Sequence, residues 1–177
     1  MLEIDAETAR DLGFPKLKYA HVERERRWLC ANLPAELVIG ADAITDLYVT
    51  GTRLRLREAT PQDGGPVMRR LGRKADVDPA HRLITSIYLS EAEFALLSGM
   101  PGRTLRKVRH RLRPLNGLAF RVDVFEGELQ GLILAECEFD DDAQMAACPH
   151  PPFAVREVTD DPRYGGAWLA THGLPPA

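Results

Sequence analysis

Residues 22–29 read Val-Glu-Arg-Glu-Arg-Arg-Trp-Leu, a highly charged segment with a regular spacing. Glu23, Glu25 and Arg27 occupy every second position, so a β-strand over these residues places all three side chains on one face. Two carboxylates beside a guanidinium are costly to bury among apolar side chains. The charged face is therefore expected to look into water, onto a metal ion or onto a charged ligand.

The remaining composition is that of one globular domain. The chain has 177 residues, of which 45% are hydrophobic and 28% charged, and this length allows one buried core. No apolar run approaches the roughly 18 residues that a membrane helix needs, and the acidic N-terminus lacks the pattern of a signal peptide. The cysteines, Cys30, Cys137 and Cys148, are odd in number and form no close pair, which argues against disulfides and a zinc site. We expect a soluble, cytoplasmic protein without a membrane partner.

Two further stretches alternate basic and apolar residues. Residues 53–57 read Arg-Leu-Arg-Leu-Arg, which predicts a strand with three arginines on one face and leucines on the other. Residues 104–113 repeat the alternation, with Lys107 and Arg109 on one face. In an ordinary sheet these basic faces would look into bulk solvent, and the other strands decide between that arrangement and an enclosed site.

Two later strands complete the charged pattern. Residues 119–125 place Arg121 and Asp123 together, and residues 132–140 place Glu136 and Glu138 together. Repeated charged faces favour a closed antiparallel sheet that turns them inward around a wet lumen and packs its apolar faces against helices. Arginine forks match phosphate oxygens, and paired glutamates can hold a divalent cation, so the pattern indicates a metal–polyphosphate site.

Three segments are less regular. Residues 32–40 have helix-compatible apolar spacing and predict a connecting helix that ends at Gly40. Residues 61–79 contain several turn signals around a short basic segment, 68–74, and are expected to be loop-rich. Near the C-terminus, Trp168 and Leu169 predict a packed helix or a plug at one mouth of the lumen.

Together these motifs resemble the CYTH family, the triphosphate tunnel enzymes. Residues 22–29 resemble the opening Glu-x-Glu-x-Lys strand of the family, with Arg27 in place of the usual lysine. The other similar motifs, in chain order, are the paired-arginine strand at 53–57, the Lys-x-Arg strand at 107–109, the hairpin strand at 121–125, the late Glu-x-Glu strand at 136–138, and the C-terminal signature at 157–159 with 163–164.

The resemblance implies a mainly β, α+β fold: an eight-stranded antiparallel closed barrel, the triphosphate tunnel, with helices packed outside. Residues 21–170 would form the single domain, after an N-terminal lead-in of residues 1–20 and before a tail of residues 171–177. The activity implied is metal-dependent hydrolysis of inorganic tripolyphosphate or related triphosphates with Mg²⁺ or Mn²⁺. A homodimer is one possible oligomeric state.

The resemblance also implies roles for individual residues. The catalytic residues would be Glu23, Glu25 and Arg27. The phosphate-binding residues would be Arg53, Arg55, Arg57, Lys74, Arg82, Lys107, Arg109 and Arg121. The metal ligands would be Glu23, Glu25, Glu136 and Glu138.

One departure from the family bears on function. Family members commonly carry an Arg-x-Glu-x-Glu strand in mid-chain, but Ile84 and Ser86 follow Arg82 in this sequence. The missing carboxylate pair puts a second metal site in doubt. The alternatives are adenylate cyclase or thiamine triphosphatase chemistry, or a non-catalytic polyphosphate- or nucleotide-binding module.

Nucleic acid is not an expected partner. The net charge is −3, and the basic strands lack the interleaved aromatic residues on which bases stack. Phe125 is almost the only aromatic residue on the faces expected to point inward. Inorganic tripolyphosphate is therefore predicted to be preferred over ATP.

Overall fold

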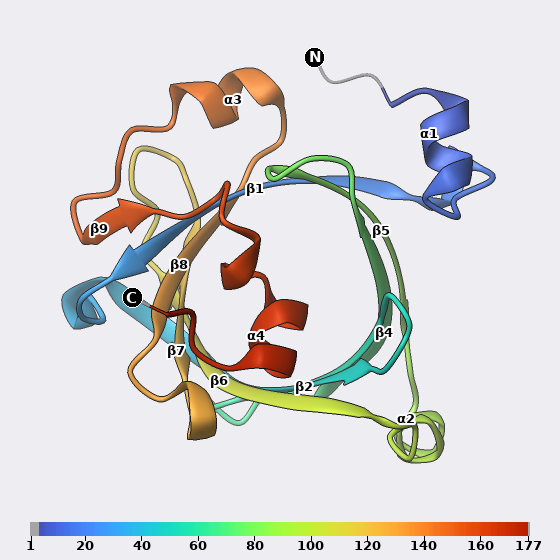
Figure 1. The fold of residues 1–177 in the computed structure, drawn as a ribbon. Helices are drawn as coiled ribbons and strands as arrows, with labels where there is room; N and C mark the ends of the chain where they lie inside the picture. The colour runs from blue at the N-terminus through green and yellow to red at the C-terminus, as the bar shows by residue number, and fades with distance from the viewer. Residues whose placement is uncertain (1–3, 177) are drawn as a thin grey trace.

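The computed structural model describes residues 4–176, which are built around one antiparallel β-sheet of nine strands. The strands are β1 (His21–Cys30), β2 (Val38–Val49), β3 (Leu54–Pro61), β4 (Met68–Asp76), β5 (His81–Tyr88), β6 (Gly102–Leu112), β7 (Phe120–Phe125), β8 (Ile133–Glu138) and β9 (Ala154–Glu157). Their order is β5-β4-β3-β2-β6-β7-β8-β1-β9, and β1 also pairs with β5. Eight strands therefore close into a barrel, with β9 added at β1 (Figure 1), which confirms the mainly β closed barrel predicted from the sequence.

The first strand, β1, closes the barrel by changing partners along its length. Residues 21–24 pair with β5, residues 25–29 pair with β8 on the other edge, and residues 28–30 pair with β9. Glu23, Glu25 and Arg27 point into the lumen, while Trp28 packs in the core on the outer face. The alternation of charged and apolar residues thus fixes which side of β1 faces inward.

Apolar side chains cover the outer face of the barrel on two sides. Trp28 is fully buried and packs on Phe120, with ring centroids 5.8 Å apart. This cluster extends to residues near α3 (Asp142–Ala147). On another side, α1 (Ala6–Asp11) and Phe14 pack on Leu83 of β5. Helices α1, α2 (Glu91–Leu97) and α3 all lie outside the ring of strands (Figure 1).

The last helix, α4 (Gly166–His172), is placed differently, because it lies within the ring of strands in Figure 1 and lines the lumen. The inner faces of β6, β7 and β8 change from charged to apolar along the strands. There Leu105, Phe125 and Leu134 form one buried cluster with Tyr164 and Leu169. This apolar patch explains why a helix is buried in an otherwise charged lumen. Short 3-10 helices complete the chain: η1 (Leu17–Tyr19), η2 (Ala35–Leu37), η3 (Gly127–Leu129) and η4 (Pro162–Tyr164).

The predicted secondary structure of two segments was wrong. Residues 32–40 form only the short 3-10 helix η2, and β2 begins at Val38, because pairing of β2 with both β3 and β6 outweighs the local apolar spacing. Residues 61–79, expected to be loop-rich, contain the nine-residue strand β4, which pairs with β3 and β5. Arginines on both faces of β4, such as Arg69 and Arg70, hide its alternation in the sequence.

Within residues 4–176, no helix has the length and apolar character required to cross a membrane.

Replacing Trp28 by Ala should lower the free energy of unfolding by about 3–5 kcal/mol, because it removes a fully buried aromatic side chain from the outer core. Urea denaturation measures the change. Tyr88→Ala is the matched control, since Tyr88 is 73% exposed, and its effect should stay within about 0.5 kcal/mol. Equal midpoints for the two variants would contradict this assignment of the core.

Candidate active site

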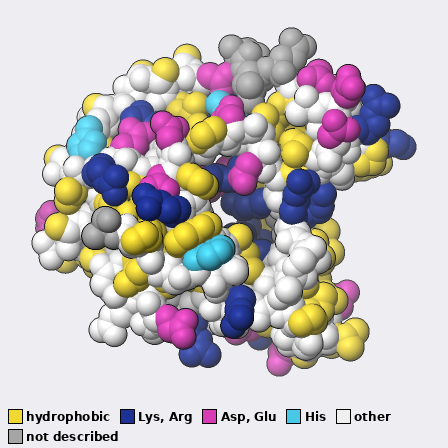
Figure 2. All heavy atoms as spheres, viewed as in Figure 1, with side chains coloured by type: hydrophobic (Ala, Val, Ile, Leu, Met, Phe, Trp, Pro, Cys, Tyr) yellow, Lys and Arg dark blue, Asp and Glu magenta, His cyan; other side chains and the backbone are white. Residues whose placement is uncertain are grey.

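The lumen is a cavity of about 1700 Å³ to which all eight barrel strands contribute side chains. Figure 2 shows its mouth as a hollow with Lys and Arg side chains along the wall. All eight residues predicted to bind phosphate line this one cavity, as do the four predicted metal ligands. The structure thus brings side chains from β1, β3, β4, β5, β6, β7 and β8 into a common space.

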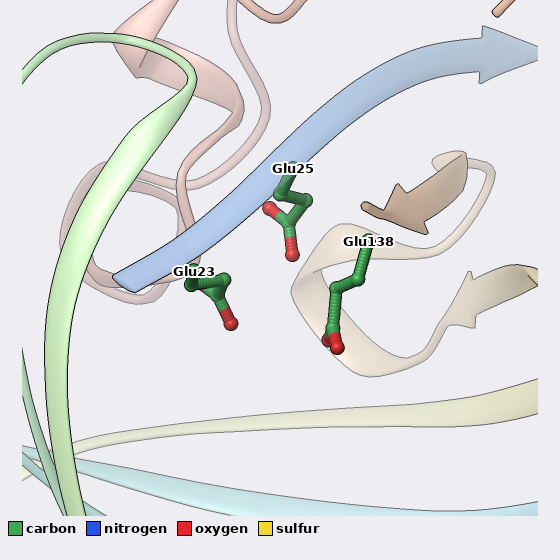
Figure 3. Close-up of side chains that lie close together, drawn as sticks. All are labelled: Glu23, Glu25 and Glu138. Atoms are coloured by element: carbon green, nitrogen blue, oxygen red, sulfur yellow. The ribbon is translucent and has the colours of Figure 1, made fainter. Parts of the chain in front are cut away.

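Three carboxylates converge on one side of the lumen. Glu23 and Glu25 extend from β1 and Glu138 from the neighbouring strand β8, and all three side chains project to the same side of these strands (Figure 3). One carboxylate oxygen of each lies within 4.8 Å of the others. Glu25 and Glu138 are directly opposite in the β1–β8 ladder, a position where like charges destabilise a sheet. We refer to Glu23, Glu25 and Glu138 as the carboxylate group.

Basic side chains from β4, β5 and β7 form ion pairs with the carboxylate group. The Lys74 Nζ donates to both carboxylate oxygens of Glu23 at 2.8 Å. The Arg82 Nη1 donates to Glu25 at 3.1 Å, and the Arg121 Nη1 donates to Glu138 at 2.7 Å. These ion pairs offset part of the cost of placing carboxylates in the lumen.

The two glutamates of β1 differ in protonation. Burial, followed by repulsion from Glu136 and Glu23, raises the pKa of Glu25 to about 7. Burial also acts to raise the pKa of Glu23, but Lys74 and Arg82 outweigh it, so the pKa of Glu23 is lowered. Near neutral pH, Glu23 is therefore ionised, whereas Glu25 is divided between its two protonation states.

A second charged group links β6, β7 and β8. The Arg109 guanidinium donates two bonds of 2.7 Å to Asp123 and also bonds Glu136, while Lys107 bonds Asp123 as well. Burial acts to raise the pKa of Glu136, but Arg109 and Lys107 hold that pKa well below its usual range. Glu136, predicted as a metal ligand, is thus paired with Arg109 and lies outside the carboxylate group.

A third charged group lies on β2, β3 and β4. Asp46 is fully buried, and its two oxygens accept from Arg57 Nε at 2.7 Å and Arg57 Nη2 at 2.6 Å. The Arg55 Nε is 3.7 Å from Asp46. Arg70 stands directly opposite Arg57 in the β3–β4 ladder and also lines the lumen. Two of the predicted phosphate-binding arginines, Arg55 and Arg57, thus share one buried counter-ion.

Two predicted site residues also have structural contacts. Arg53 donates from Nη1 to the carbonyl of Leu12 at 2.9 Å, which ties it to the segment after α1 at the edge of the lumen. Arg27 donates from Nη1 to the carbonyl of Tyr164 at 2.9 Å, and its Nε is 3.4 Å from Glu25. Arg27 therefore connects the carboxylate group to the segment that leads into α4.

Sequence reasoning left three residues out of the site: Arg70, which lines the lumen, and Asp46 and Asp123, which are fully buried and pair with arginines that line it. Asp123 shares a strand face with Arg121, and Asp46 shares one with Ile44 and Tyr48, but a single acid in a strand is a weak signal. The even spacing of Arg70 and Lys74 could have indicated a strand in 68–74. Ile84 and Ser86, which replace the family carboxylates, do line the lumen.

Fold and site together define a class: a closed antiparallel barrel whose interior is arranged to bind a polyanion. The chain is 32% identical over 154 residues to the inorganic triphosphatase of Nitrosomonas europaea, covering 84% of this chain and 96% of that protein. It is 40% identical over 60 residues to the inorganic triphosphatase of Acetivibrio thermocellus, which is 34% of this chain and 36% of that protein.

The crystal structure of the inorganic triphosphatase NE1496 matches with a TM-score of 0.58 and 27% identity, covering 88% of this chain and all of that one. PH1819 from Pyrococcus horikoshii shares the fold, with a TM-score of 0.54 and 19% identity over 70% of this chain and 82% of that one. No protein-family model matches the sequence. The relationship to the Nitrosomonas protein shows that the chain belongs to the CYTH family of triphosphate tunnel enzymes.

Glu25→Gln should stabilise the metal-free protein at pH 8 but not at pH 5. The pKa of Glu25 is about 7 in the folded state against 4.5 ordinarily, so the folded state binds the extra proton and stability is lost as pH rises through this window. The gain from the neutral amide at pH 8 should reach up to about 3 kcal/mol. Chemical denaturation in chelator-treated buffer at both pH values measures it, and a gain that does not change with pH would contradict the assignment.

Proposed function

We propose that this protein hydrolyses inorganic tripolyphosphate in the lumen, with the help of a divalent metal ion, by cleaving a terminal phosphoanhydride bond. The observation on which this rests is that many guanidinium and ammonium groups face the same cavity as three converging carboxylates. The similarity of the chain to two proteins named inorganic triphosphatase supports the same reaction.

The basic residues would hold the phosphate chain. Lys107 and Arg109 on β6 and Arg121 on β7 lie on the wall next to β8, while Arg55 and Arg57 lie across the lumen on β3. Each of these side chains already pairs with a carboxylate, so substrate oxygens would share or replace existing ion pairs. Such preorganised donors need little rearrangement when charge develops on the phosphoryl oxygens.

The carboxylate group fits a divalent cation such as Mg²⁺ or Mn²⁺. Its three oxygens come within 4.8 Å of one another, and carboxylate oxygens are the ligands that these hard ions prefer. The pKa of Glu25 is raised by burial and by repulsion from neighbouring carboxylates, and a bound cation would offset that repulsion. When bound there, the ion would supply positive charge that offsets the charge of the substrate phosphates.

Within the carboxylate group, we assign different roles to the two glutamates of β1. Glu23 is kept ionised by Lys74 and Arg82 and is suited to hold a cation with Glu138. Glu25, which lies beside these two carboxylates and accepts from Arg82, is assigned to accept a proton from the attacking water. Water then attacks the terminal phosphorus in line, the bridging P–O bond breaks, and orthophosphate and pyrophosphate are released.

The lumen favours a compact substrate over a nucleotide. Three of the aromatic side chains that line it serve packing, whereas Tyr19 is 65% exposed. Phe125 and Tyr164 are buried in the cluster with Leu169. The Tyr48 hydroxyl lies so close to Gly166 that a Cβ there would be 2.0 Å away. None of these three rings is thereby left as an open platform for a base.

We further propose residues 21–170 as the unit that has this activity, in the cytoplasm, with residues 1–20 and 171–177 as flanking segments. A packing role for the first flank is supported by Ala9 and Phe14, which are buried in one cluster with Ala75 and Leu83.

A phosphate-release screen tests the function. Tripolyphosphate, ATP and thiamine triphosphate are supplied with Mg²⁺, with Mn²⁺ or with chelator. We expect tripolyphosphate to give at least about tenfold higher kcat/KM than ATP and chelator to abolish release, since without a bound cation the carboxylates repel the substrate. A preference for ATP or formation of cyclic AMP would favour the cyclase alternative, and tight binding without release would favour a binding module.

Glu138→Gln should lower metal-dependent phosphate release by at least about tenfold and raise the metal concentration required, because it removes one carboxylate of the group. Glu128→Gln is the control, since Glu128 is exposed, outside the lumen and close in sequence. Titration of activity with Mn²⁺ measures both effects. An unchanged metal requirement in Glu138→Gln would remove Glu138 from the metal site.

A further inference from the structure

Arg70 is a lumen residue that none of the family motifs in the sequence includes. It lies in β4, half-buried, and faces the same cavity as Arg55 and Arg57 of β3. In the β3–β4 ladder Arg70 is the direct partner of Arg57, and like charges at such positions destabilise a sheet. The fold thus holds three guanidinium groups together against their mutual repulsion.

The counter-charge beside these arginines is incomplete. Asp46 is bonded through both oxygens to Arg57 and lies 3.7 Å from Arg55. Among residues 4–176, Arg70 makes no ion pair within 4.0 Å and no hydrogen bond through its side chain. Burial, together with the charges of Arg57 and Arg55, lowers the pKa of Arg70. An anion placed between the three arginines would remove this repulsion.

The position of this cluster relative to the carboxylate group indicates what it binds. The carboxylate group extends from β1 and β8; in the closed strand order β3 is the fourth strand from β8, and β5 separates β4 from β1. Along β4, Arg70 is four residues from Lys74, which bonds Glu23, and that separation is about 13 Å at the rise of a strand. A phosphate at the arginine cluster is therefore well separated from a phosphate at the carboxylate group.

We infer that Arg55, Arg57 and Arg70 form an anion subsite that binds the phosphate group of the substrate farthest from the carboxylate group, with Arg70 supplying a guanidinium that has no internal partner. The inference deepens the proposed function and rests on it for the identity of the substrate. The subsite would select for length, because a polyphosphate must span the distance between the arginine cluster and the carboxylate group to contact both. Arg70 is thus a specificity-determining residue rather than a participant at the reacting phosphorus.

Binding of pyrophosphate without metal tests the subsite independently of hydrolysis. In chelator-treated buffer the carboxylate group repels anions, so pyrophosphate should bind at the arginine cluster. By isothermal titration calorimetry, Arg70→Gln should weaken its binding about tenfold or more through loss of a charge-assisted contact. Arg69→Gln is the matched control, because Arg69 is adjacent in β4 but pairs with Glu58 outside the lumen, and it should bind as wild type does.

Thermal denaturation of the ligand-free variants tests whether each variant is folded. Removing a repelled charge should leave the melting temperature of Arg70→Gln unchanged or raised. Equal pyrophosphate affinity in Arg70→Gln and wild type, or equal weakening in both variants, would overturn the subsite.

Steady-state kinetics with tripolyphosphate and metal supply the second test. Arg70→Gln should raise KM about tenfold with kcat nearly unchanged, because the contact is made to a phosphate remote from the reaction. A fall in kcat at unchanged KM would overturn the assignment by placing Arg70 at the reacting phosphate. If the wild-type protein releases phosphate from no triphosphate, the proposed function fails, and the metal-free titration still decides whether the anion subsite exists.

Discussion

The structure depends on mutual pairing of charged side chains inside a closed barrel. Carboxylates and guanidinium groups that face a lumen lose much of their hydration, so each one that lacks a partner is costly. The ladders place Glu23 opposite Arg82 and Asp46 opposite Arg57, so strand register decides which of these charges can pair. A slip of one residue in β1 would turn Arg24, Arg26 and Trp28 inward in place of Glu23, Glu25 and Arg27, and would destroy both the lumen and the outer core.

Helix α4 determines how the charged interior is used. Its burial against Leu105, Phe125 and Leu134 fills the apolar part of the lumen and leaves the charged part accessible. The contact from Arg27 to the carbonyl of Tyr164 joins this packing to the carboxylate group. Charges in such a confined space interact more strongly than on an open surface, because less water screens them.

Two features of the lumen cost stability in the absence of a ligand. Glu25 is buried beside other carboxylates, and Arg70 is held beside other arginines without a partner of its own. Glu25 lies on β1 and Arg70 on β4, with β5 between them, so these walls present regions of opposite sign. A cation at one wall and a phosphate chain reaching the other would satisfy both, which gives a physical reason for retaining groups that destabilise the empty protein.

The sequence alone determined the closed antiparallel barrel and most of its charged lining, since alternation in 22–29, 53–57 and 104–113 dictates which face of each strand is charged. It also predicted correctly that the arginines and lysines of these strands point inward, because few folds tolerate repeated inward arginines.

The pairing of the charges, in contrast, depends on how the strands come together in the barrel. Glu136 faces inward as its spacing predicts, but it forms an ion pair with Arg109. Glu138 instead lies close to the two glutamates of β1. Arg70 and Asp46 became visible as site residues only through strand pairing, because β4 has arginines on both faces and one aspartate in β2 gives no pattern. Local alternation fixes the direction of a side chain, whereas its neighbours across the barrel depend on register between strands distant in sequence.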